Sequence, residues 1–233
     1  MRRNSRQRGG LRWTAVAAAV ASLALAVTGC GQTRLGAAAL YQNQRISTAQ
    51  LAAQVSNLST GYQAYKSRLQ MPYRAADMPR QVLSWLLRFA TAERVATRTG
   101  ITVTPAQAQA QLIAEKARAN QAGDTLREAA VLNGLPPDLL PELGRWIAIQ
   151  IKLQAKLDHG VQPTTAAAQQ ALLLKVNQVQ CKAAKSLQIQ VNPQYGVFDY
   201  GHLVVVPAPN KLAAAPGGRK TPASQAPQLT PRC

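Results

Sequence analysis

The sequence has few of the residues on which most enzyme active sites depend. Its 233 residues include nine acidic residues, two histidines and three cysteines. It contains no Gly-x-Ser-x-Gly elbow, phosphate-binding loop, His-Glu-x-x-His motif or paired-cysteine metal spacing. The histidines, His159 and His202, are isolated, and His159 lies at the expected end of a helix, where a positive imidazole interacts favourably with the dipole. We therefore expect no enzyme activity, no metal site and no cofactor.

The first 30 residues are typical of a secretory signal peptide that ends in a lipidated cysteine. Five arginines and no acidic residue precede an uncharged apolar run from Trp13 to Val27. The ending Val27-Thr28-Gly29-Cys30 resembles a bacterial lipobox, which implies cleavage before Cys30, a diacylglycerol on its sulfur and usually an added acyl chain such as palmitate. An uncleaved membrane helix is the alternative, but the apolar run is shorter than the ~20 residues needed to span a bilayer.

This interpretation divides the chain into four parts. We expect a signal peptide at residues 1–29, a lipidated tether at 30–36, a folded domain at 37–206 and a disordered tail at 207–233. The tail is rich in Pro, Ala, Gly, Ser and Gln, and it lacks the apolar content to offset the entropy of ordering. The protein would be anchored by lipid on the outer, extracytoplasmic face of the cell membrane.

Acidic residues are scarce relative to basic ones. The net charge is +18, and removal of the five arginines of the signal peptide leaves +13. Such an excess favours anionic partners, including lipid headgroups, phosphate-bearing wall polymers and acidic proteins. Nucleic acid is not expected as a partner of a secreted lipoprotein. The alternative is that the basic residues, which are dispersed along the chain, serve only to keep the surface solvated and soluble.

Cysteine is also scarce, and after Cys30 only Cys181 and Cys233 remain. An oxidising compartment permits a disulfide between these two residues, and the long tail gives Cys233 the necessary reach. A free thiol on each is the alternative, since two scattered cysteines do not form a framework. The helical period places Cys181 opposite the apolar stripe of its helix, so we expect its side chain to face outward.

The domain between tether and tail is expected to be mainly α-helical. Aromatic residues make up 5% of the chain, and an Ala- and Gln-rich sequence with few β-branched runs favours helices. Ser47 and Gln50 form a capping box before a helix whose weak point is Gly61. Further helices are expected at 80–99, from Thr104-Pro105 to about 120, from a cap at Asp124 to Gly134, from Pro136 to about 157, and at 165–187. Short strands are expected at 37–41, 188–191 and 201–206.

The order of these segments resembles the N-terminal domain of the SurA-like family of extracytoplasmic chaperones, which is related in shape to the trigger factor arm. The resemblance rests on Gly36-Ala-Ala-Ala-Leu-Tyr-Gln-Asn-Gln-Arg-Ile46, on Gly100-Ile-Thr-Val-Thr104 and on Ile189-Gln-Val-Asn-Pro-Gln-Tyr-Gly196. It implies that the first and last segments meet in a small β element. Many relatives carry a parvulin-type prolyl isomerase domain before the last helix. Here only residues 160–165 separate the two helices, so we expect no isomerase activity.

One segment combines aromatic and methionine residues near breaks in helicity, a composition suited to adaptable apolar surfaces. The candidate client-binding residues are Tyr62, Tyr65, Met71, Tyr73 and Met78. A place in the core is the alternative for each of them. The resemblance to the SurA-like family implies a lipid-anchored holdase or escort for secreted polypeptides, whereas the sequence pattern alone indicates an anchored helical lipoprotein. The alternative function is a lipoprotein binding or scaffold module that docks one envelope partner or an anionic wall polymer.

Overall fold

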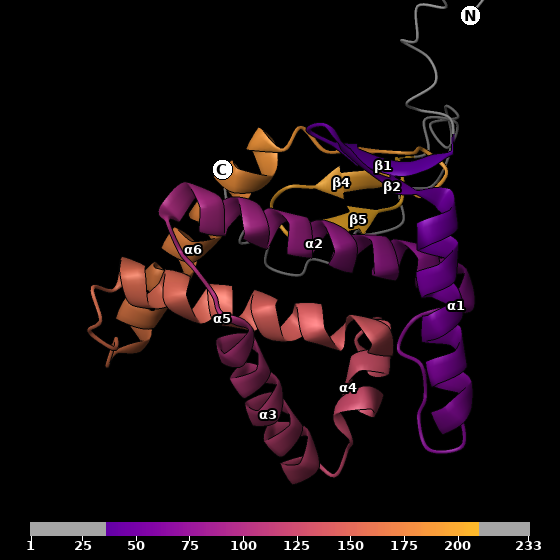
Figure 1. Ribbon diagram of the computed structural model, residues 1–233, viewed down its shortest axis with the longest axis horizontal. Helices are drawn as coiled ribbons and strands as arrows, with labels where there is room; N and C mark the ends of the chain where they lie inside the picture. The colour runs from indigo at the N-terminus through magenta and orange to yellow at the C-terminus, as the bar shows by residue number, and fades with distance from the viewer. Residues whose placement is uncertain (1–35, 210–233) are drawn as a thin grey trace, which may run out of the picture.

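The computed structural model describes residues 36–209, which form a mainly α-helical domain, as the sequence predicts (Figure 1). The predicted signal peptide, Cys30, Cys233 and almost all of the predicted tail lie outside the described residues. The helices are α1 (Thr48–Tyr65), α2 (Met78–Thr99), α3 (Pro105–Gln121), α4 (Leu126–Leu132), α5 (Leu140–Leu157) and α6 (Ala166–Ser186), with 3-10 turns η1 (Ala75–Asp77) and η2 (Pro137–Leu139). Every helix of this part of the chain is too short or too polar to cross a bilayer.

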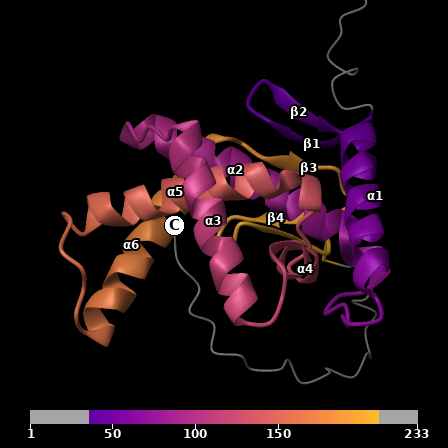
Figure 2. The same ribbon diagram turned by 60° about the horizontal axis from the view of Figure 1, so that its bottom comes forward.

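Two small antiparallel sheets complete the domain. Strand β1 (Ala37–Tyr41) forms a hairpin with β2 (Gln44–Ser47) and pairs on its other side with β3 (Gln190–Val191). The predicted meeting of the first and last segments is therefore confirmed, and Figure 2 shows these strands beside one end of α1. Strands β4 (Val197–Asp199) and β5 (Val204–Val206) form a separate hairpin. The sequence did not predict β4.

The predicted helix caps explain where the main helices begin and end. At the start of α1, Ser47 Oγ accepts from Gln50 N and Gln50 Oε1 accepts from Ser47 N. Thr104 and Gln107 form the same pair of bonds before α3. Gly100 ends α2 with a φ of 68°. The prediction of Asp124 as the cap of α4 was wrong, because Thr125, with a glutamate three residues later, forms a complete capping box.

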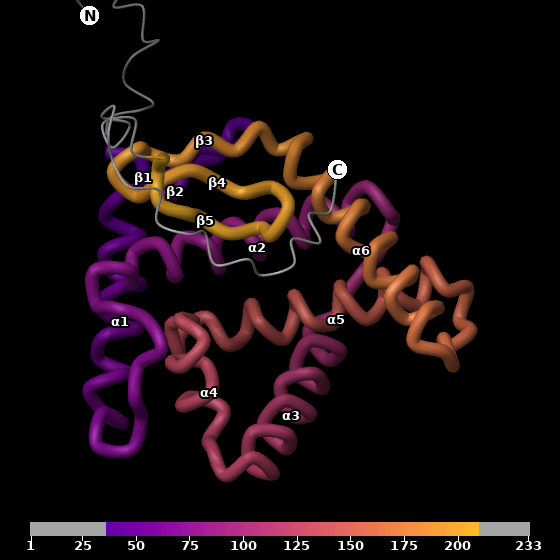
Figure 3. The backbone as a smooth tube through the Cα atoms, turned by 180° about the vertical axis from the view of Figure 1, so that it is seen from behind, coloured from indigo at the N-terminus to yellow at the C-terminus, as the bar shows by residue number. Residues whose placement is uncertain are grey.

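Helix α2 is the centre of the fold and joins two hydrophobic cores. Its first half packs with Leu51 and Leu58 of α1, with the sheet that contains β1, and with Val205 of β5. Its second half packs with residues of α5 and α6, including Ile149 and Val176. Figure 3 shows α2 running behind β4 and β5, with α5 below it. Most of the circumference of α2 is therefore covered, as its predominantly apolar sequence predicts.

Two side-chain expectations need correction. The apolar spacing in α5 predicts a core position for Ile151, but its side chain is 45% exposed. Cys181 was expected to face outward, but it is 1% exposed. The last turns of α6 lie between the two cores, with Ala183 in one and Ala184 in the other, so both sides of the helix are covered there. Gly61 has a packing role, because a Cβ there would lie 2.9 Å from Val131 Cγ2.

Candidate functional site

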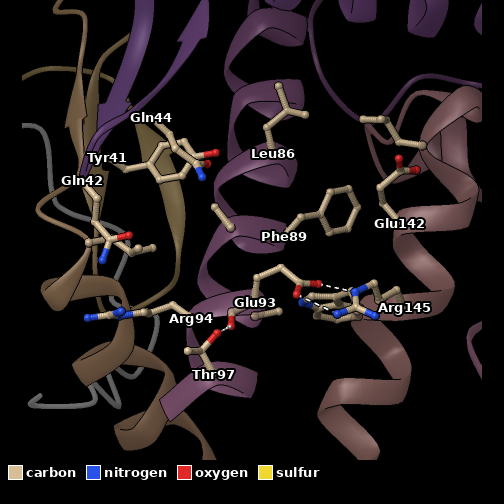
Figure 4. Close-up of a pocket in the computed structure, with 15 residues that line it drawn as sticks. Tyr41, Gln42, Gln44, Leu86, Phe89, Glu93, Arg94, Thr97, Glu142 and Arg145 are labelled. Carbon is tan, nitrogen blue, oxygen red and sulfur yellow. Dashed lines mark hydrogen bonds and ion pairs between the residues drawn. The ribbon is translucent and has the colours of Figure 1, made fainter. Parts of the chain in front are cut away.

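A groove runs along α2 between the β1–β2 hairpin and α5. Its main cavity has a volume of about 490 Å³. Figure 4 shows the hairpin residues Tyr41 and Gln44 on one side, Leu86 and Phe89 of α2 in the middle, and Arg145 of α5 on the other side. We call this cavity, together with the smaller one described below, the α2 groove. Its lining combines apolar walls with charged side chains.

The floor of the groove is one strip of α2. Its residues follow one another at steps of four, three and four: Leu86, Ala90, Glu93 and Thr97. At 3.6 residues per turn, this spacing keeps them on the same side of the helix. Leu86 and Ala90 are partly buried, whereas Glu93 and Thr97 are exposed. The floor is therefore apolar at one end and polar at the other.

Charged groups hold the polar end of the groove in place. Arg145 Nε and Nη2 donate to the Glu93 carboxylate at 2.5 and 2.9 Å, and Arg145 Nη1 donates to the carbonyl of Val103 at 3.0 Å. The hydrogen bonds to Glu93 raise the pKa of Arg145 above its ordinary value. On the other side of the floor, Arg94 Nε donates to Ser186 Oγ at 2.9 Å. These bonds connect α2 to both α5 and α6, and they leave the groove open.

A second cavity of about 340 Å³ extends the groove towards α1. It shares Tyr41 and Leu86 with the first cavity, so the two cavities are adjacent. Its remaining walls are Arg45 and Ile46 of β2 and Gln50, Ala53 and Gln54 of α1. Gln54 Oε1 is buried and accepts no hydrogen bond from any group within residues 36–209. A buried acceptor without a donor is destabilising, and a partner with an N–H group would relieve that cost.

The predicted client-binding residues lie elsewhere and serve largely as packing residues. Met78 is 6% exposed and belongs to the first core, and Met71 and Tyr62 pack against it. The Tyr73 hydroxyl donates to the carbonyl of Val131 at 2.7 Å, and burial raises the pKa of Tyr73 to about 12. Tyr65 is partly buried near the end of α1. Met78 is therefore a core residue, which is the alternative given in the sequence analysis. None of the five side chains lines the α2 groove.

Sequence reasoning missed the residues that do line the groove. Leu86, Phe89 and Trp146 are apolar residues of helices, and their spacing predicts core positions. Phe89 and Trp146 both pack around the buried Trp85, with ring centroids 5.7 and 5.8 Å from it. Nothing in the local pattern separates a core residue from one that borders a groove, because both occur at the same helical spacing.

The other candidate residues do not form a second site. His202 Nδ1 lies 2.7 Å from Asp199 Oδ2 in the β4–β5 turn, and no group of three His, Cys, Asp or Glu within residues 36–209 is arranged to hold a metal ion. Cys181 is disulfide-bonded. Its two possible partners, Cys30 and Cys233, lie outside the described residues, so the pairing with Cys233 stays a prediction.

Comparisons with protein-family models, with curated proteins and with solved structures found no match to this chain.

Proposed function

We propose that the protein is a lipid-anchored holdase or escort that binds segments of unfolded secreted polypeptides in the α2 groove, without prolyl isomerase activity. The observation that carries this proposal is the pair of adjacent cavities along α2, which share Tyr41 and Leu86. The groove extends along α2 from Leu86 to Thr97, which is long enough to hold a short segment of polypeptide. Its floor, which is apolar at one end and polar at the other, suits partners that differ in sequence.

The composition of the groove favours weak, reversible binding. The larger apolar side chains that line it, among them Tyr41, Leu86 and Phe89, are already partly or fully buried, so they offer limited apolar surface to a client. A client that fully buries one or two apolar side chains gains about 1.5–3 kcal/mol for each. Most of that gain is offset by the loss of freedom on association. Such a balance allows clients to be released without an energy source.

The membrane anchor in this proposal depends on Cys30. Two or more acyl chains hold a protein stably at a membrane, because each buried methylene contributes about 0.8 kcal/mol. The variant Cys30→Ala should therefore lose metabolic labelling by fatty acid and should be released from membranes by washing. Full labelling of Cys30→Ala would contradict the anchor while leaving the groove unaffected.

The disulfide of Cys181 provides a separate check on the same anchor. A thioether on Cys30 removes that sulfur from disulfide chemistry, so only Cys233 remains as a partner for Cys181. Mass spectrometry of the non-reduced, proteolysed protein should identify a peptide pair that joins Cys181 and Cys233. A pair that joins Cys181 and Cys30 would rule out lipid on Cys30.

The chaperone activity is tested with the chain that begins at residue 30 and carries Cys30→Ser to avoid lipidation. Light scattering follows the aggregation of several unrelated denatured proteins diluted into this protein, at low and at high salt. We expect suppression for all of them at both salt concentrations, and weaker suppression by Leu86→Glu. The matched control is Ile113→Glu, which places the same charge at a 62% exposed site on α3. The result that would refute the proposal is aggregation of all clients as in buffer. Suppression restricted to one client or to low salt would favour the docking module instead.

A further inference from the structure

The second cavity has the geometry of a site for an added β-strand. We propose that a client segment in extended conformation pairs with the open edge of β2 and lies between β2 and α1, above Leu86. This inference rests on the proposed function and specifies how the same groove holds its client. The occupant is a polypeptide backbone, with side chains that alternate between the cavity and solvent.

The hydrogen-bonding direction of each strand residue identifies the open edge. Strand order is β2-β1-β3, so within residues 36–209 β2 is paired on one side only. On β1, the carbonyl of Ala38 accepts from Asn192 N, which shows that even-numbered residues of β1 direct their backbone groups towards β3. Leu40 follows the same alternation and pairs with Gln190.

Arg45 therefore carries the backbone groups that a client could use. It lies opposite Leu40 in the β1–β2 ladder. In an antiparallel ladder, two opposite residues either exchange both hydrogen bonds or direct both pairs of groups away from each other. Because Leu40 bonds towards β3, the N–H and C=O of Arg45 point away from β1, to the open edge. The next strand residue on this edge, Ser47, uses its N–H in the cap of α1.

The walls of the cavity fit a strand at this edge. A neighbouring strand lies about 4.8 Å from β2, and the facing residues of α1 are Gln50 and Ala53, both exposed. Leu86 and Ile46 offer an apolar floor to the inward side chains. Gln54 lines the same space, and rotation of its amide would expose the buried Oε1 and let it accept from a client N–H. The positive charge of Arg45 favours neutral or acidic segments.

Substitutions at Arg45 distinguish backbone pairing from charge. Proline is tolerated on an edge strand where the N–H faces solvent, but it removes that donor. Arg45→Pro should therefore keep the fold while blocking the added strand, whereas Arg45→Ala removes the charge and keeps the N–H. The probe is a fluorescein-labelled nine-residue peptide of alternating valine and threonine with a glutamate at each end, followed by fluorescence polarisation on the full chain with Cys30→Ser.

We expect Arg45→Pro to weaken binding of this peptide about tenfold and Arg45→Ala about twofold. Gln54→Leu should weaken it about threefold, since the acceptor is lost at similar volume. Equal losses in the proline and alanine variants, or no loss in the proline variant, would overturn the strand-addition mode. Thermal unfolding of each variant verifies that its fold is intact.

Peptide variants keep the proposal testable even if Arg45→Pro does not fold. Two probes carry N-methyl groups on alternate residues, one set at odd and the other at even positions. Strand addition uses N–H groups on one side only, so one probe should bind the wild-type chain like the parent peptide and the other should lose binding. Equal binding by the two probes would refute strand addition. If the parent peptide binds, and Leu86→Glu weakens it while Arg45→Pro does not, the groove function stands and only this inference fails.

Discussion

Two β-hairpins lie against α2, and they are held in place by different hydrogen bonds. The β4–β5 hairpin is bonded directly to it: Ser84 Oγ accepts from Val205 N at 2.8 Å, and Arg88 Nε donates to the carbonyl of Leu203 at 3.1 Å. The β1–β2 hairpin is held instead by the end of α6, where Gln42 N donates to the carbonyl of Leu187 at 2.8 Å. Its buried residues share the first core with α2, and the groove opens beside that core.

The difference shows how one helix can serve as both core and binding surface. The covered side of α2 consists of Ser84, Leu87, Arg88, Thr91 and Val95, and the groove side consists of Leu86, Ala90, Glu93 and Thr97. Leu87 and Val95 are fully buried, whereas the groove side is partly or fully exposed. Stability should therefore depend on the covered side, and client binding on the groove side.

The largest expected effect comes from two adjacent leucines. Leu87→Ala removes a fully buried side chain and should lower the free energy of unfolding by about 2–5 kcal/mol, whereas Leu86→Ala should cost less than about 1.5 kcal/mol. Chemical denaturation of both variants measures these values. Peptide binding should show the opposite order, with a weaker affinity for Leu86→Ala than for any folded Leu87 variant such as Leu87→Met. Equal stability losses at the two positions would remove the distinction between the sides.

A smaller effect is expected from the hydrogen bond that joins Ser84 of α2 to Val205 of β5. Ser84 is buried, donates to the carbonyl of Arg80 and accepts from Val205 N. Ser84→Ala leaves the Val205 N–H without an acceptor, which should cost about 1–3 kcal/mol. Hydrogen exchange at Val205 should accelerate, while exchange at Ile46 in the other hairpin should not change. Acceleration at both residues would mean that the two hairpins are coupled through α2.

Much of the fold follows from local sequence signals. The capping boxes at Ser47 and Thr104 and the glycine at Gly100 locate three helix ends, because caps are local interactions of side chains with nearby backbone. The helical period likewise places Val176 and Ala183 of α6 in the core. It misplaces Cys181 because a single stripe cannot represent a helix end that lies between two cores.

The groove could not be predicted in the same way. It arises where the β1–β2 hairpin and α5 approach α2 without touching along one strip, and that separation is a property of three segments distant in sequence. Tyr73 and Met78 were candidates because they lie near a break in helicity, yet the fold turns them towards Val131 and the first core. A break in a helix marks where the chain turns, and it does not indicate which side of the turn faces solvent.

The smallest expected effect is a loss of stability at acidic pH that arises in the β4–β5 hairpin. Partial burial raises the pKa of Asp199, but this is outweighed by hydrogen bonds from the ring of His202 and the backbone N–H groups of Gly201 and His202, so its pKa lies below the ordinary value. A depressed pKa in the folded state means that the carboxylate stabilises the fold above its unfolded pKa. That stabilisation is lost as the pH falls through the folded pKa.

Asp199→Asn should therefore reduce the loss of stability between about pH 5 and pH 3, by less than about 1 kcal/mol because the pair is partly exposed. Thermal melts of wild type and variant across this range measure the difference, and taking the difference cancels the contributions of Asp77 and Glu128, whose pKa values are also lowered. Identical pH profiles for the two proteins would show that the turn at Asp199 does not couple to global unfolding. In that case the two bonds from Ser84 and Arg88, rather than the turn, would hold the β4–β5 hairpin on α2.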